Sequence, residues 1–297
     1  MSNLENKIDF ALVISAKNAN PNGDPLNGNR PRVNYGGKGE ISDVCIKRKV
    51  RNRLMQEGKN VFVQMEENKL DEYKSLSERF NAAVSRIDKK ASEKEVAEFV
   101  CGEWIDVRSF GQVFAFKPPT SKSAEDKGVS GVSIGIRGPV SVHPAFSVDT
   151  VNTTSTQITK SVNSETSAKG GKSSDTMGMK HRIDFGVYVT YGSINVELAK
   201  KTGFGEEDAA DIKNALMTLF RNDASSARPE GSMAVEKLIW WRHNNASGQY
   251  SSAKVHKSLK VAKKDSAQDA DSVSSIDDYD ITVENLDGLS AEIIDGE

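Results

Sequence analysis

The chain has 297 residues, of which 37% are hydrophobic and 28% are charged, and its formal net charge is −2. This length suffices to bury a large core, either in one domain or in a core that carries insertions. No apolar stretch approaches the ~18 residues of a membrane span, the N-terminus lacks a signal-peptide pattern, and Cys45 and Cys101 fit no metal-binding spacing. We therefore expect a cytoplasmic protein with no membrane partner, no metal and no cofactor.

The charges are distributed unevenly along the chain. Residues 265–297 contain eleven acidic residues and no Lys or Arg, which leaves 31 acidic against 40 basic residues in residues 1–264, a net charge of +9. A basic body indicates a polyanionic partner, and an acidic tail could mask or mimic that partner. An acidic tail that only improves solubility fits the pattern equally well.

A strand is predicted over residues 8–14 (IDFALVI), because β-branched and aromatic residues are nearly continuous there. In the loop over residues 17–32, Pro, Gly and Asn recur every two or three residues and exclude regular structure. Loops of this length in a compact domain are usually functional or disordered. The loop contains one carboxylate, Asp24. It is either a catalytic group or, as we favour, the cap of a turn.

The next element is predicted to be a helix over residues 42–58, with Ser42 or Asp43 as its N-cap and Gly58 at its end. Apolar residues spaced by four form its buried stripe, and five cations cover the rest. Because like charges repel on a helix, this density predicts an anion nearby. The stripe is Ile46, Val50 and Leu54, and the cations are Lys47, Arg48, Lys49, Arg51 and Arg53.

Residues 60–104 are predicted to be a charged, amphipathic helical insertion. Alternation over residues 106–116 predicts a strand, and residues 131–148 continue as strand or extended chain. The strand over 106–116 would place on one face Arg108, Phe110, Gln112, Phe114 and Phe116.

Residues 150–180 are rich in Ser, Thr, Gly and Lys, a composition that cannot order itself alone. Within them, TQITKSV (156–162) can form one strand of an exposed hairpin. A strand is predicted over residues 182–192, a helix over 203–223 and a final strand over 235–244, in which Trp240 and Trp241 point to opposite faces.

Without the insertions, the element order is strand, helix, strand, strand, helix, strand. This order predicts an α+β protein with a ferredoxin-like, RNA-recognition-type sheet. In that arrangement two helices cover one face, and the other stays open for RNA. Arg182, Tyr188 and Arg242 are expected on the open face.

The sequence shows no enzyme motif: there is no H-E-x-x-H, G-x-S-x-G, P-loop or paired-cysteine pattern, and the four histidines are scattered. Arg30 and Arg32 end the first loop ahead of the basic helix. Open backbone N–H groups beside Gly and Asn bind phosphate without reading sequence. Phe110 could stack on a base or belong to the core. Together these features favour a single-stranded nucleic acid as the partner.

Eight motifs in chain order resemble the backbone subunit of the type I-C CRISPR surveillance complex (Cascade), which belongs to the RAMP superfamily. The resemblance covers about residues 5–262. The motifs are AKNANPNGDP, SDVCIKRKVRNRL, DVRSFGQVF, GPVSVHPAFSVD, QITKSVN, DTMGMKHRIDFGVYVTYG, LFRNDASSARPEGSM and WWRHNNASGQYSSAKVHKSL.

The resemblance implies a hand-like molecule and a role in antiviral defence. Copies would polymerise head to tail along one CRISPR RNA, and thumb hairpins would displace guide bases at intervals so that the segments between pair with a target DNA strand. The other implied partners are the subunit that processes and caps the guide end and the large and small Cascade subunits. The implied domains are an RRM-like palm (1–59, 105–140 and 181–262), helical fingers (60–104) and a thumb (141–180), with the acidic tail (263–297) outside the resemblance.

The resemblance implies a non-catalytic subunit without a metal. Related type III backbone subunits cut target RNA with an aspartate in this first loop, so a metal-dependent nuclease that uses Asp24 is the alternative. The RNA-binding residues implied are Asn20, Asn22, Arg30, Lys47, Arg48 and Arg51 for the phosphates, Phe110 and Gln112 on the palm, and Lys160, Met177 and Lys180 on the thumb.

Overall fold

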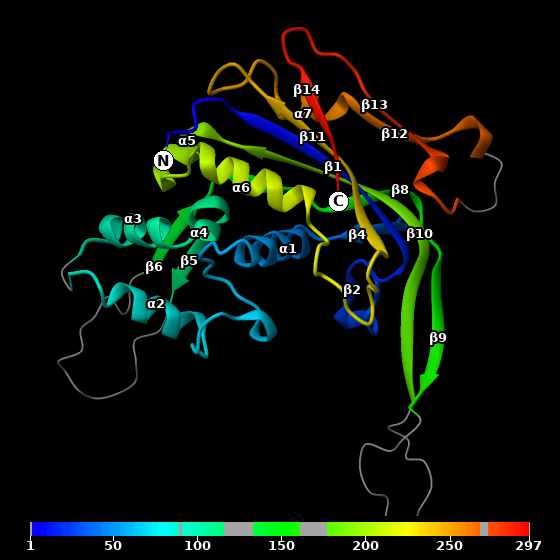
Figure 1. Cartoon of the computed structure of the whole chain (residues 1–297), viewed down its shortest axis with the longest axis horizontal. Helices are drawn as coiled ribbons and strands as arrows, with labels where there is room; N and C mark the ends of the chain where they lie inside the picture. Colours follow the sequence, from blue (N-terminus) through cyan, green and yellow to red (C-terminus); the bar gives the residue numbers. More distant parts are fainter. Residues whose placement is uncertain (1, 89–90, 116–132, 161–176, 268–272, 297) are drawn as a thin grey trace, which may run out of the picture.

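The structure is a computed structural model that describes residues 2–88, 91–115, 133–160, 177–267 and 273–296. Within these ranges the largest element is an eight-stranded antiparallel sheet, along one face of which lie helices α1 and α6 (Figure 1). The strand order is β14-β11-β1-β10-β8-β4, and β7 and β9 also pair with β10. The strands are β1 (Ile8–Ala19), β4 (Lys38–Ile41), β7 (Val140–Val142), β8 (Ala145–Thr150), β9 (Thr153–Thr159), β10 (Met177–Ile194), β11 (Met233–Arg242) and β14 (Ala291–Asp295).

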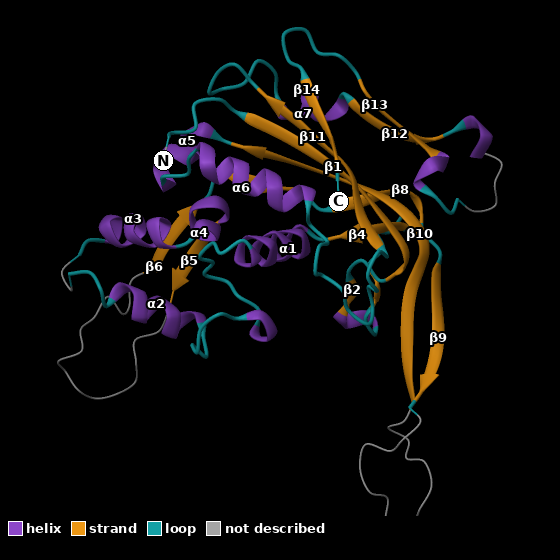
Figure 2. Cartoon of the chain, in the orientation of Figure 1, coloured by secondary structure: helices purple, strands orange, loops and turns teal. Residues whose placement is uncertain are grey.

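Three further strand pairs, β2–β3, β5–β6 and β12–β13, lie outside this sheet (Figure 2). The helices are α1 (Asp43–Gln56), α2 (Leu76–Val84), α3 (Glu93–Glu103), α4 (Ile105–Phe110), α5 (Val196–Thr202), α6 (Glu206–Met217) and α7 (Ser252–Lys257), and the short strands are β2 (Gly23–Asp24), β3 (Arg30–Pro31), β5 (Gly111–Ala115), β6 (Ser133–Arg137), β12 (Leu259–Lys263) and β13 (Tyr279–Val283).

The main core lies between the sheet and the α1–α6 layer. Because side chains alternate along a strand, β1 sends Phe10, Leu12 and Ile14 into this core, where they meet the apolar stripes of both helices. The predicted helix over 42–58 is confirmed, since Ser42 Oγ accepts the N–H of Cys45 at 3.3 Å. The predicted positions of the two tryptophans are confirmed as well: Trp240 stacks on Phe10 in this core, and Trp241 lies in the core on the other face.

The prediction of an open sheet face is wrong. Helix α7, the β12–β13 pair and the chain near Leu289 cover the second face and form a core there with Val13 and Trp241. Tyr188, expected on the open face, is 1% exposed on the helix side, and Arg242 pairs with Glu206 at 2.6 Å. The physical reason is that residues 252–267 and 273–289 supply enough apolar side chains to cover the face.

A separate core joins α2, α3 and the β5–β6 pair, with Phe62, Phe80 and Phe114 in contact at its centre. The prediction of one strand over 106–116 is wrong in its first half, because residues 105–110 form α4 and the strand starts at Gly111. Gly111 has φ +80°, which ends the helix. Phe116 lies outside the described residues.

The first loop contains more regular structure than its composition predicts. Strand β1 continues to Ala19 because β10 offers a partner as far as Ile183, and β2 and β3 form a short pair within the loop. No helix in the described ranges is both long enough and apolar enough to cross a membrane.

Candidate nucleic-acid interface

The two asparagines predicted to bind phosphate hold the first loop in shape. Asn20 is 2% exposed; its Nδ2 donates to the carbonyl of Asn29 at 2.7 Å, and its Oδ1 is buried without a partner. Asn22 Oδ1 accepts hydrogen bonds from the backbone N–H and the hydroxyl of Ser42, at 3.0 and 2.9 Å. Asn22 therefore holds the loop against the start of α1, whereas Asn20 connects two parts of the loop to each other.

Asp24 caps a turn, as favoured from the sequence. Its Oδ1 accepts the N–H of Leu26 at 3.2 Å and lies 3.8 Å from the guanidinium of Arg32. Gly28 adopts φ +61° where this turn ends. No cluster of three or more His, Cys, Asp or Glu side chains that could hold a metal was found in the part of the chain that the structure describes.

Most cations of α1 pair with carboxylates of this same chain, so the anion that the sequence predicts nearby is supplied within the protein. Lys47 pairs with Asp43 at 3.0 Å, and Arg51 Nε donates to Asp106 Oδ2 at 2.8 Å. Arg48 lies half-buried, with its guanidinium against the sulfur of Met65 at 3.2 Å. Asp106 is 55 residues from Arg51 in the sequence, so the residue pattern of the helix cannot predict this contact.

The other two cations of the helix are buried. Lys49 is 1% exposed and pairs with Asp223, and burial lowers its pKa against the raising effect of that carboxylate. Arg53 is held by Glu57 at 2.9 Å and by Thr218. These two residues connect α1 to α6 and to the loop that follows it.

Phe110 and Gln112 do not share a strand face. Phe110 is half-buried at the end of α4 against the main core, with the guanidinium of Arg51 5.2 Å from its ring centroid. Gln112 lies on β5, and its amide donates to the carbonyl of Val113 at 3.1 Å. Phe110 thus supports Arg51 and the core, whereas Gln112 remains at the surface of the α2–α3 unit.

Strand β9 and the first half of β10 form a hairpin that projects from the sheet (Figure 2). Its register pairs Met177 with Thr159 and Lys180 with Thr156. Met177 is 63% exposed, Met179 is 54% exposed, and Lys180 and Lys160 are also exposed. The part of the predicted thumb over 161–176 lies outside the described residues.

Three segments meet at the C-terminal end of β1. The backbone N–H of Lys17 donates to Ser232, and that of Asn20 donates to Ala227, both at 2.8 Å. Strand β3 lies against β10 at the base of the hairpin. Within the described ranges, five buried side-chain polar atoms lack a hydrogen-bond partner, and three belong to this junction: Asn20 Oδ1, Arg32 Nε and Ser232 Oγ. Unsatisfied buried polar atoms are rare in folded proteins, so their concentration here marks a candidate binding site.

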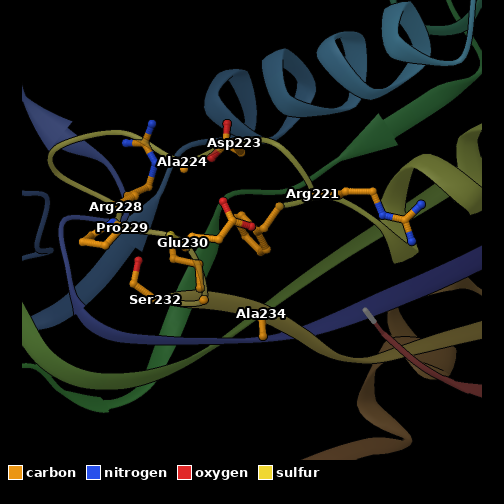
Figure 3. Close-up of a pocket in the computed structure, with 11 residues that line it drawn as sticks. Arg221, Asp223, Ala224, Arg228, Pro229, Glu230, Ser232 and Ala234 are labelled. Carbon is orange, nitrogen blue, oxygen red and sulfur yellow. Dashed lines mark hydrogen bonds and ion pairs between the residues drawn. The ribbon is translucent and has the colours of Figure 1, made fainter.

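The sequence interpretation missed the loop between α6 and β11, residues 218–232, as part of this site. Figure 3 shows the pocket that this loop and its flanks form. The signals in the sequence were the turn-forming run RPEG at 228–231 and the motif LFRNDASSARPEGSM of the family resemblance, which contains it. Both indicate a loop, but neither predicts what the loop contacts.

Comparisons with known proteins agree on one family. The sequence model for CRISPR-associated protein Cas7 matches residues 6–284. The CRISPR-associated protein Cas7 of Haloferax volcanii is 26% identical over 299 residues, which cover 97% of this chain and 85% of that protein.

Two solved chains are also similar. A chain of a CRISPR RNA-guided surveillance complex in a pre-nicking state aligns with a TM-score of 0.47 and 15% identity, over 82% of this chain and 81% of its own. A chain of a second CRISPR RNA-guided surveillance complex aligns with a TM-score of 0.41 and 16% identity, over 79% of this chain and 68% of its own. Because the family model spans most of the sequence, from residue 6 to residue 284, this chain belongs to the Cas7 family of CRISPR-associated proteins.

Proposed function

We propose that this Cas7-family chain is a non-catalytic backbone subunit that binds CRISPR RNA without reading its sequence. The observation that carries the proposal is the junction at the end of β1, where three of the five unpartnered buried polar atoms of the described chain lie together. Family membership supports the same role. The copies would polymerise head to tail along the guide and present it to a strand of invading DNA, as the resemblance implies.

The topology supports a palm, fingers and thumb. The order β11-β1-β10-β8, with α1 and α6 on one face, is the order of a ferredoxin-like sheet, which we propose as the palm. The fingers would comprise α2 and α3 together with β5 and β6, since Phe114 and Ile134 pack in the core of the insertion. The thumb would be the β9–β10 hairpin. Residues 263–267 and 273–289 would help to cover the second sheet face, and β14 would extend the sheet beside β11, so the described part of the tail would not be free.

The positions of the exposed cations reduce the set of residues that we expect to contact RNA. Lys17, Arg30 and Lys180 are exposed around the junction, and none of them pairs with a carboxylate among the described residues. We assign Arg30 and Lys180 to guide phosphates, with Lys47 and Arg48 beside them on α1, and Met177 to the displacement of a base. The remaining predicted residues would have indirect roles. The loop and the helix would be held in place by Asn20, Asn22, Arg51 and Phe110, and the RNA-binding surface would be enlarged by Gln112 and Lys160.

We further infer that the complex is of type I-C and acts in the cytoplasm. The quoted motifs support the subtype. The partners would be CRISPR RNA, a target DNA strand, other copies of this chain, the guide-end capping and processing subunit, and the large and small subunits.

The test is co-expression of the chain with a guide and measurement of the RNA that co-purifies. Arg30→Ala with Lys180→Ala should lower the slope of log affinity against log salt by about 1.4, since each phosphate contact to a single strand contributes about 0.7. Lys200→Ala with Lys201→Ala removes the same charge at the far end of α5 and should leave the slope unchanged.

Two results would contradict the proposal. One is the absence of RNA from the purified wild-type protein. The other is metal-dependent cleavage of a complementary RNA that Asp24→Ala abolishes, which would favour a nuclease.

A further inference from the structure

An open groove of about 700 Å³ lies on the second face of the sheet, between β12 and the strands β8 and β10 (Figure 1). Phe146 stands opposite Val189 in the β8–β10 register, so both side chains point to this face. Phe146 is 40% exposed, and Val148, Val189 and Tyr191 are half-buried beside it. The floor of the groove is therefore an apolar surface that the described chain leaves partly uncovered.

Strand β12 has one hydrogen-bonded edge and one open edge. On the bonded edge, the N–H of Glu284 donates to Ser258 at 2.8 Å, and β12 pairs with β13 along its whole length. Because bonded residues alternate along an antiparallel strand, the N–H and C=O groups of Val261 point away from β13. No other described strand pairs with β12. The open edge borders the groove, since β12 lines the groove and β13 does not.

These features specify the chemistry of an occupant. An open strand edge beside an apolar floor accepts an extended polypeptide, whose side chains would point alternately to the floor and to solvent. Lys38 and Lys260 line the groove, and no carboxylate of the described residues does. Lys260 pairs with Glu284 at 2.6 Å, but both side chains are more than half exposed and remain open to a cross-strand neighbour. Carboxylates on the solvent side of the added strand would complement these lysines.

We propose that this groove binds an extended acidic strand of a partner protein, which adds to the open edge of β12. The apolar side chains of that strand pack on Phe146 and its neighbours, and its backbone bonds to Val261. A nucleic acid fits less well, because its backbone cannot match the alternating donors and acceptors of a strand edge. The inference goes beyond the proposed function, since none of the residues assigned to RNA lines the groove.

The experiment measures the fluorescence anisotropy of labelled heptapeptides with the full-length chain at neutral pH. One peptide alternates Glu and Val, and a second has Lys in place of Glu. Two further versions of the first carry N-methyl groups, one on every Val and the other on every Glu, so each blocks the N–H groups of one edge. The Glu–Val peptide should bind roughly tenfold more tightly than the Lys–Val peptide. Only one N-methylated version should lose binding, because one edge of the added strand pairs with β12.

Variants of the chain test the same contacts. Val261→Pro removes an N–H that the described fold does not use and should weaken the Glu–Val peptide roughly fivefold, as expected for one lost backbone hydrogen bond. Phe146→Glu places a negative charge on the floor and should weaken that peptide as well. Ile293→Glu is the matched control, because Ile293 is 52% exposed on β14, outside the groove, and this variant should bind as wild type does.

Several results would overturn the inference. They are no saturable binding of the Glu–Val peptide at millimolar concentration, and loss of binding in both or in neither of the N-methylated versions. Self-association of wild type that Phe146→Glu abolishes would assign the groove to a second copy, and loss of RNA binding in Phe146→Glu would assign it to nucleic acid. If wild type binds no RNA but the peptides behave as expected, the proposed function fails and this inference stands.

Discussion

Substitution of Arg51 tests whether the cations of α1 stabilise the fold or bind RNA. Its side chain is 14% exposed, its Nε donates to Asp106 at 2.8 Å, and its guanidinium lies over the ring of Phe110. Asp106 is 1% exposed and also accepts the backbone N–H groups of Phe62 and Val63, at 2.7 and 3.1 Å. Arg51→Met therefore leaves a buried carboxylate without its cation.

Breaking a buried ion pair by removing one partner costs about 3–5 kcal/mol. The two backbone donors that remain on Asp106 place the expected loss near the lower end, about 3 kcal/mol. The measurement is urea unfolding followed by tryptophan fluorescence, in which such a loss lowers the midpoint by roughly 1–2 M.

Arg48→Met is the matched control. Arg48 is a half-buried cation of the same helix that contacts sulfur atoms rather than a carboxylate, so its unfolding midpoint should stay near that of wild type. A loss below about 1 kcal/mol in Arg51→Met would refute the structural role. Arg51 would then be available to the guide, as the sequence alone suggested.

Three other predictions follow from the same contacts. Phe114→Ala removes a fully buried ring that packs on two other rings, and it should lower the free energy of unfolding, measured with urea, by about 3–5 kcal/mol. A much smaller loss would contradict the core described for the insertion. Gly111→Ala should cost roughly 1–3 kcal/mol, because φ is +80° and a Cβ would lie 2.3 Å from the carbonyl oxygen of Ile136; a neutral midpoint would contradict this geometry. Hydrogen bonds from Arg79 lower the pKa of Asp71, so this pair stabilises the fold above the unfolded pKa of about 4 and the contribution is lost as the pH falls through the folded pKa. In Arg79→Met, the free energy of unfolding should therefore fall less than in wild type as the pH is lowered. The same pH dependence as in wild type would show that the ion pair contributes nothing to stability.

Several features of the fold could be predicted because their causes are local. The helix over 42–58 follows from the Ser42 cap and apolar residues spaced by four, and the opposed tryptophans follow from strand alternation. The turn at Asp24 follows from the short side chain, which reaches its own backbone two residues on. These signals lie within one or two turns of chain and need no knowledge of distant contacts.

The candidate site was predictable only in part. The first loop and the hairpin were located from composition, but the sequence assigned Arg51 to RNA because its partner, Asp106, lies 55 residues away. A charge pattern on one helix shows repulsion within that helix and says nothing of the carboxylates that fold onto it.

Only the tertiary structure decided the remaining features. It placed the α6–β11 loop against the end of β1, buried Lys49 beside Asp223, and packed α7 and the β12–β13 pair over a sheet face that the element order left open. The sequence by itself determined that α1 and α6 are helices and that β1, β10 and β11 are strands, because periodicity and capping are properties of neighbouring residues. Burial and charge pairing depend on which distant segments meet, and that is fixed by packing the whole chain.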